Sequence, residues 1–169
     1  MGMDVHGRKP DSPAGEYFRA NVWSWHPIAE YCRLVAPNLI GKIEYLHSND
    51  GDGLGGTDSR KLAALLKEQI ESGGTERYLA SEQAKLDALP DEKCDMCDGT
   101  GIRTDEVGVK NGMPDRITTL PDGTERKGYC NNCQGKGSLR PWATHYGFDL
   151  DHLKEFAEFL EHCGGFSIC

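Results

Sequence analysis

The feature that most constrains this chain is a short cysteine motif that occurs twice in its second half. The first copy, CDMCDGTG, spans residues 94–101, and the second copy, CNNCQGKG, spans residues 130–137. Both follow the pattern C-x-x-C-x-G-x-G, in which two cysteines three positions apart face one ion if the chain between them turns tightly. The glycines permit left-handed backbone conformations that bring N–H groups close to the sulfur atoms. Two such pairs supply the four thiolates of a closed tetrahedral zinc site.

We therefore expect one structural Zn²⁺ bound by four cysteines. Four protein ligands leave no open position for water, so catalysis by the metal is disfavoured. Redox activity of either pair is the alternative interpretation of the spacing, whereas the three cysteines without paired spacing are expected to be buried free thiols. The expected ligands are Cys94, Cys97, Cys130 and Cys133, and the unpaired cysteines are Cys32, Cys163 and Cys169.

The length and composition fit one compact domain, or one domain with a small insert. The chain has 169 residues, of which 37% are hydrophobic, so it can build a core of modest size. No apolar run approaches the length of a membrane span, and the first ten residues lack the apolar stretch of a signal peptide. We therefore expect a cytoplasmic protein without a membrane partner. The cytoplasm keeps cysteine thiols reduced, and reduced thiols suit metal binding better than disulfides do.

The formal net charge of −8 makes nucleic acid a disfavoured partner, because an acidic protein gains little from attraction to phosphate backbones. Residues 91–141 are nearly neutral, with eight basic and nine acidic side chains. A local basic patch in or near this segment stays open as an alternative. Its members would be Arg103, Lys110, Arg116, Arg126, Lys127, Lys136 and Arg140.

Apolar side chains at helical spacing predict helices on both sides of the cysteine motifs. One helix is expected to open at Pro27, another to follow Asp58 and a third to follow Asp149, each with one apolar face. Residues 1–15 are expected to form a loose arm, because they contain two prolines and several glycines. Residues 166–169 are expected to add a short terminal strand.

The 32 residues between Cys97 and Cys130 contain two strong turn signals, Asn-Gly at residues 111–112 and Pro-Asp-Gly at residues 121–123. Residues 117–120 suit a strand before the second turn. One or two hairpins are therefore expected to project from a zinc ribbon.

The predicted fold class is α+β, with a mainly helical body that is discontinuous in sequence. The apolar helix faces before and after the cysteine motifs need one another for burial, so residues 1–90 and 142–169 are expected to form this body. Residues 91–141 are expected to form an inserted module, a zinc ribbon with a β-hairpin.

A second candidate site lies outside the cysteine motifs. The loop of residues 47–58 offers carboxylates to a cation or polar ligand, but its twelfth position counted from Ser48 is Ser59, where a calcium loop needs glutamate. The alternative is a solvated, glycine-rich turn. The aromatic side chains within residues 17–25 could line a ligand pocket, with His26 as its polar anchor. The alternative interpretation is that these aromatic side chains pack in the core. The possible ligand-binding residues are Trp23, Trp25, His26, His47, Asn49, Asp50, Asp52 and His145.

At the two motifs the chain resembles the cysteine-rich zinc region of DnaJ chaperones, in which four C-x-x-C-x-G-x-G motifs hold two zinc ions. Two motifs in residues 94–137 imply one site. No J-domain is recognisable, because His26-Pro27 is followed by Ile28 rather than aspartate, so co-chaperone activity is not implied. Small two-motif proteins such as the anti-TRAP regulator are similar in motif number and use the zinc fold to bind another protein. The rest of the chain resembles small uncharacterised bacterial or phage proteins, a likeness that implies no activity.

These observations favour a regulatory module that binds another protein through its zinc-bearing segment, with Arg116 and Arg126 of the hairpin as expected contacts. The sequence contains no nucleophile elbow, phosphate loop, dinucleotide motif or metalloprotease histidine pair, so an enzyme is disfavoured without being excluded. The alternative function is a small-molecule-binding protein or enzyme with a pocket near His26, His47, Asp50 and His145. Nucleic-acid binding through the zinc module ranks third. The oligomeric state is left open.

Overall fold

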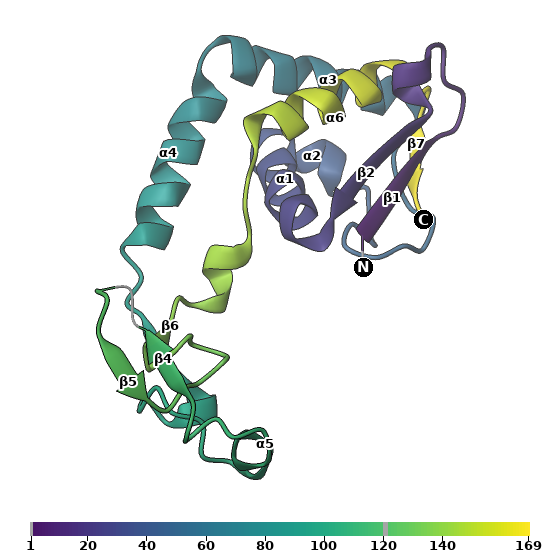
Figure 1. Ribbon diagram of the computed structural model, residues 1–169. Coiled ribbons are helices and arrows are strands. Elements are labelled where there is room, and N and C mark those ends of the chain that lie inside the picture. The colour runs from purple at the N-terminus through teal and green to yellow at the C-terminus, as the bar shows by residue number, and fades with distance from the viewer. Residues whose placement is uncertain (1, 120–121) are drawn as a thin grey trace. The chain divides into compact units, whose positions relative to one another are not determined.

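The computed structural model describes residues 2–119 and 122–169 and divides the chain into two compact units (Figure 1). Unit 1 comprises the chain up to Lys85 together with His145–Cys169, and unit 2 comprises Leu86–Thr144. Unit 1 combines helices with a three-stranded antiparallel sheet, and unit 2 contains two two-stranded antiparallel sheets. The α+β fold class is therefore confirmed. Among the described residues, no helix is both long and apolar enough to cross a membrane.

The first residues of the chain form the central strand of the sheet in unit 1, so the expected loose arm is wrong. Strand β1 (Gly2–Gly7) pairs with β2 (Tyr17–Asn21) on one side and with β7 (Phe166–Ile168) on the other. Val5 lies opposite a residue of each neighbour and is completely buried. Apolar and polar residues alternate along β1, which puts one of its faces against the core. Strand β7 confirms the expected terminal strand.

Two helices of unit 1 begin where a polar side chain accepts hydrogen bonds from free backbone amides. Asn21 caps α1 by accepting hydrogen bonds from the amides of Trp23 and Ser24, at 2.9 and 3.0 Å, so this helix begins before Pro27. Asp149 caps α6 as predicted, by accepting from the amide of Asp151. The helices that lie wholly or partly in unit 1 are α1 (Val22–Val35), α2 (Pro37–Ile40), α3 (Gly56–Glu71), α4 (Gly74–Asp87) and α6 (Leu150–His162), with 3₁₀ turns at Pro13–Gly15 and Trp142–His145.

The core of unit 1 lies between the sheet and these helices. Helices α3 and α6 run side by side, and α6 also packs against β2 (Figure 1). Tyr31 and Thr75 share a buried hydrogen bond of 2.9 Å between their hydroxyl groups. Among the unpaired cysteines, Cys32 and Cys163 are buried as expected, but Cys169 is exposed because it follows the last strand.

Unit 2 consists of short elements around the cysteine motifs. Helix α5 begins at a cap, because the Asp105 carboxylate accepts a hydrogen bond from the amide of Gly108. The strand predicted over residues 117–120 is present as far as Thr119. Residue 120 of that strand and residue 121 of the predicted turn lie outside the described residues. The elements are β3 (Glu92–Lys93) paired with β6 (Ser138–Leu139), β4 (Ile117–Thr119) paired with β5 (Glu125–Lys127), a 3₁₀ turn at Asp95–Cys97 and α5 (Glu106–Lys110).

The buried hydroxyl pair of unit 1 gives a direct test of the core. Replacing Thr75 with Val should lower the free energy of unfolding by about 1–3 kcal/mol, because the Tyr31 hydroxyl would stay buried without a partner. The double variant with Tyr31→Phe should cost less than the sum of the two single changes. Urea unfolding followed by circular dichroism measures all three values, and additive costs would contradict the assignment.

Candidate metal centre

The four cysteines of the two motifs converge on one point in unit 2. Their sulfur atoms all lie within 4.8 Å of one another, and all four side chains are buried. The Sγ atoms of Cys94 and Cys130 are 3.9 Å apart, and those of Cys97 and Cys133 are 3.7 Å apart. These distances are much longer than a disulfide bond of about 2.05 Å. The four thiols are therefore free and could hold a metal ion, as the sequence predicts.

Each motif turns through the same backbone conformation. The residue after the second cysteine is left-handed in both copies, with a φ of 51° at Asp98 and 52° at Gln134. Glycine follows in both copies and also has positive φ. A non-glycine residue with positive φ is uncommon, so its occurrence at the same place in both motifs shows that the two turns are built alike.

The turns direct backbone amides at the sulfur atoms of the second cysteine in each motif. The amide of Gly101 donates to Cys97 Sγ, and the amide of Gly137 donates to Cys133 Sγ, both at 3.2 Å. Such hydrogen bonds stabilise thiolates, which are the form of cysteine that binds metals. The predicted use of the glycines is confirmed at these two positions.

The two motifs also contact each other through these same glycines. A Cβ atom on Gly101 would lie 2.3 Å from the carbonyl oxygen of Gly135, and one on Gly137 would lie 2.3 Å from the carbonyl oxygen of Gly99. Real Cβ atoms do not approach oxygen so closely, hence any larger side chain would push the motifs apart. The reciprocal contact fixes how one cysteine pair faces the other.

Arg126 joins the two motifs from the hairpin side. Its Nη2 atom donates to the carbonyl oxygens of Gly101 and Gly135, at 2.9 and 2.8 Å. The guanidinium therefore bridges backbone carbonyl groups of both motifs. Arg126 is also one of the two residues expected to contact a partner, and that expectation stays a prediction. The other expected contact, Arg116, lies over the ring of Tyr129, 5.0 Å from its centroid.

The sulfur atoms influence one another's ionisation. Burial raises the pKa of Cys133 to about 11, aided by hydrogen bonds with the neighbouring thiols. Burial acts in the same direction on Cys94, but hydrogen bonds from Asn132 and from the other thiols outweigh it and lower the pKa of Cys94 to about 7. One sulfur thus ionises readily while another resists. A bound cation would favour all four thiolates, and such soft donors suit zinc and other thiophilic metals.

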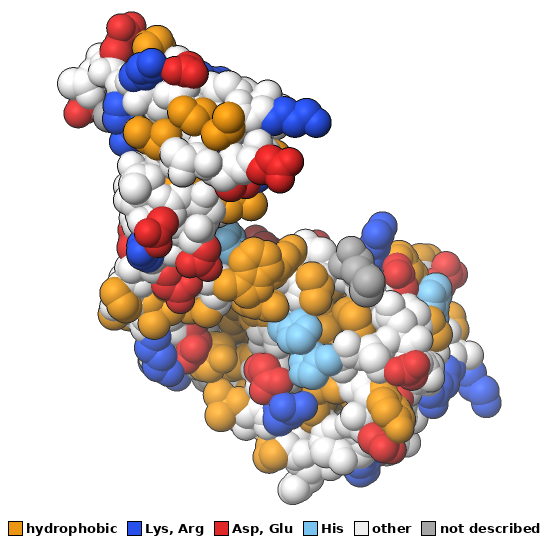
Figure 2. Space-filling model, turned by 90° about the horizontal axis from the view of Figure 1, so that it is seen from below, with side chains coloured by type: hydrophobic (Ala, Val, Ile, Leu, Met, Phe, Trp, Pro, Cys, Tyr) orange, Lys and Arg blue, Asp and Glu red, His pale blue; other side chains and the backbone are white. Residues whose placement is uncertain are grey.

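Three of the predicted ligand-binding residues gather on the surface of unit 1. The rings of His26 and His47 are stacked, with centroids 4.3 Å apart and an interplanar angle of 17°. Nε2 of His47 lies 3.2 Å from a carboxylate oxygen of Glu30. Figure 2 shows a pair of histidine side chains in contact, bordered by hydrophobic and acidic side chains. The third residue, His145, is linked to this pair through two other rings: His26 lies 5.6 Å from Tyr146, Tyr146 lies 5.0 Å from Trp23, and Trp23 lies 6.3 Å from His145, all between ring centroids.

Sequence reasoning missed Glu30 as part of this cluster. The signal was present, because Glu30 stands four residues after His26 and so shares its helix face. Partial burial, with a smaller contribution from the neighbouring His47, lowers the pKa of His26. Within the described part of the chain, the four cysteines form the one group of three or more ligand side chains spaced for a metal.

The other predicted ligand-binding residues take part in the fold of unit 1. Trp25 is buried in the core and donates from Nε1 to the carbonyl oxygen of Leu46. Asp52 accepts hydrogen bonds from the amides of Glu44 and Tyr45, and these bonds, with that from Gly53, lower its pKa. Asn49 donates to the carbonyl oxygen of Gly2, and Asp50 accepts from the Ser48 hydroxyl.

Comparisons with protein-family models, with curated proteins and with solved structures give no match to this chain. The geometry of the cysteine cluster therefore carries the functional argument.

The contact between the motifs predicts a selective effect of one methyl group. Gly137→Ala should weaken metal binding by at least tenfold, because the new Cβ would meet the Gly99 carbonyl oxygen. Gly112→Ala is a matched control, since Gly112 also has positive φ but has no atom within 4 Å of an added Cβ. It should cost only the conformational strain of about 1 kcal/mol. Competition with a coloured chelator measures both affinities, and equal losses would contradict the proposed contact.

Proposed function

We propose that unit 2 is a zinc-stabilised module that docks onto another protein. The observation that carries this proposal is the composition of its core: the buried cluster of unit 2 consists of the four cysteines, with Leu139 packed against it. A unit of this kind has little apolar surface to bury, so a bound metal must supply much of its folding free energy. A metal that builds a fold, with all four ligands from the protein, fits a structural and not a catalytic role.

Zinc is the metal that the geometry favours. A tetrahedral site with Zn–S bonds of about 2.3 Å has sulfur–sulfur edges of about 3.8 Å. The two sulfur pairs at 3.7 and 3.9 Å match this edge length. The repeated motif adds support through its resemblance to the DnaJ zinc region, in which the same pattern holds zinc.

The surface of unit 2 supports a protein partner. Five large hydrophobic side chains of this small unit are about half exposed or more, which is a feature of surfaces that bind other proteins. Three of them belong to the segment between the motifs. The five residues are Met96, Val107, Val109, Ile117 and Trp142.

The cations of unit 2 are largely engaged within the unit, which supports a protein partner over a nucleic acid. Arg103 pairs with Asp105, and Lys127 pairs with Asp115. Arg140 contacts Asp91 and the carbonyl oxygens of two further residues. Cations held in this way have less to gain from phosphate groups, whose attraction dominates nucleic-acid binding.

The metal assignment predicts one zinc ion per chain. Native mass spectrometry of protein isolated under reducing conditions should show this mass, and Cys94→Ser should abolish it. Removing the ion with a chelator should expose unit 2 to proteases while the helices of unit 1 stay protected, because the two units have separate cores. Replacement by Co²⁺ should give the absorption of tetrahedral thiolate coordination. A metal-free protein with an equally resistant unit 2 would refute the assignment.

The docking proposal predicts that the partner is lost when a charged side chain is introduced into the exposed apolar surface of unit 2. A native mass spectrum of protein gently isolated from its own cells should show a second polypeptide, and Ile117→Glu should remove it without affecting zinc content. Ile117 is 59% exposed, so the change should not disturb folding. The control is Tyr45→Glu, at a residue of unit 1 that is 51% exposed.

The two variants distinguish the outcomes. Retention of the polypeptide by Tyr45→Glu and its loss from Ile117→Glu would support docking through unit 2. Retention by both variants would exclude this surface, and the mass of a small molecule in place of a polypeptide would favour the ligand-binding alternative.

A further inference from the structure

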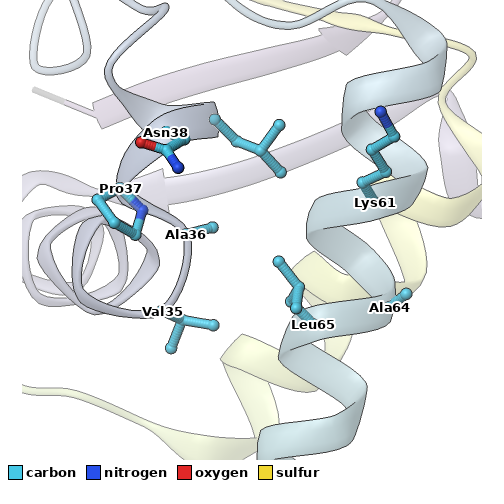
Figure 3. A pocket seen from close by; sticks show the side chains of 8 residues that line it. Val35, Ala36, Pro37, Asn38, Lys61, Ala64 and Leu65 are labelled. Carbon is cyan, nitrogen blue, oxygen red and sulfur yellow. The ribbon is translucent and has the colours of Figure 1, made fainter.

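A groove in unit 1 lies between the α1–α2 corner and α3, far in sequence from the cysteine motifs. Its volume is about 480 Å³, within the range of about 300–1,000 Å³ that is typical of small-molecule sites. Figure 3 shows Val35 and Ala36 on one side of this space and Leu65, which points toward them from α3, on the other. The lining residues are Val35, Ala36, Pro37, Asn38, Leu39, Lys61, Ala64 and Leu65.

The walls of this groove are lined mostly by aliphatic side chains, and backbone polar groups of the α1–α2 corner are already hydrogen-bonded within the fold. The carbonyl oxygen of Ala36 accepts hydrogen bonds from the amides of Leu39 and Ile40, and that of Pro37 accepts from Gly41. Pro37 has no amide hydrogen to offer. A ligand chain that lies here meets carbon atoms, so its burial is driven by the hydrophobic effect. The alanine side chains of Ala36 and Ala64 leave the space unfilled.

One end of the groove is polar and positively charged. Figure 3 shows the side chains of Lys61 and Asn38 at the end away from Val35 and Leu65. The Lys61 ammonium lies 3.8 Å from the carboxylate of Asp58, but that carboxylate also binds Lys42 at 2.5 Å. Two ammonium groups thus share one carboxylate, and a net positive charge remains.

We infer that this groove binds a single-chain carboxylic acid of medium length, with its alkyl chain between Val35 and Leu65 and its carboxylate at Lys61. Charge complementarity selects the occupant: a chain with an anionic end satisfies both ends of the groove, whereas a neutral or cationic chain satisfies only one. The volume accommodates one alkyl chain. This site is independent of the proposed function, because it lies wholly in unit 1.

Isothermal titration calorimetry with decanoate tests the inference on the full-length protein. Decanoate should bind with one site per chain, and octanoate should bind about 15-fold more weakly, because each buried methylene contributes about fourfold in affinity. Decanol and decylammonium should both bind more weakly than decanoate. Lys61→Gln should reduce decanoate affinity by about fivefold and leave decanol unchanged.

Two matched pairs of variants complete the test. Lys67→Gln, on the same helix but paired with Glu161, should leave decanoate binding unchanged. Ala64→Phe should fill the groove and abolish binding, whereas Ala80→Phe, at an exposed position of α4, should not. Circular dichroism checks that each variant folds. If Ala64→Phe does not fold, the Lys61→Gln variant alone tests the inference. Undetectable decanoate binding, unchanged affinity in folded Ala64→Phe or Lys61→Gln, or equal affinity for decylammonium would overturn the inference.

Discussion

The convergence of four cysteine sulfurs within 4.8 Å is the constraint on which unit 2 depends. Four thiolates so close together repel one another, and four neutral thiols are weak hydrogen-bonding groups that give little cohesion. The strands around them are only two or three residues long. Such short strands add little stability by themselves. A cation at the centre of the four sulfurs would attract all four thiolates and so outweigh their mutual repulsion. The same residues that would destabilise the metal-free unit would then form its core.

The geometry around the sulfurs explains why this part of the molecule was predictable from sequence. The spacing of two cysteines and the glycines after them is a local property, and each motif folds within eight residues. The clamp by Arg126 could not be predicted in the same way. The clamp depends on how Arg126, 25 residues after Gly101, returns to that glycine within the hairpin. The sequence around a single arginine does not indicate which carbonyl groups it will bind.

The wrong predictions for unit 1, the loose arm and the start of the first helix, have a different physical origin. Residues 1–15 contain the turn-forming prolines and glycines that suggest a loose arm, but the strand that pairs with a given strand can come from anywhere in the chain. The last strand supplies one partner of β1, and the sequence separation between them exceeds 150 residues. The alternation of apolar residues in β1 was a usable signal. The start of α1 was likewise readable from Asn21, whose side chain caps the helix.

The loop of residues 47–58 is acidic and glycine-rich, a composition that suggests a ligand site. Its hydrogen bonds to the backbone of the last strand explain part of this composition. The amide of Gly51 donates to the carbonyl oxygen of Ile168, and the amide of Ile168 donates to that of Asp52. The loop therefore continues the hydrogen bonding beyond β7, the last strand of the sheet. Gly53 must be glycine, because a Cβ atom there would lie 2.1 Å from the carbonyl oxygen of Phe166. Gly53 thus serves close backbone approach, and the Asp52 carboxylate binds amides that the turn would otherwise leave free.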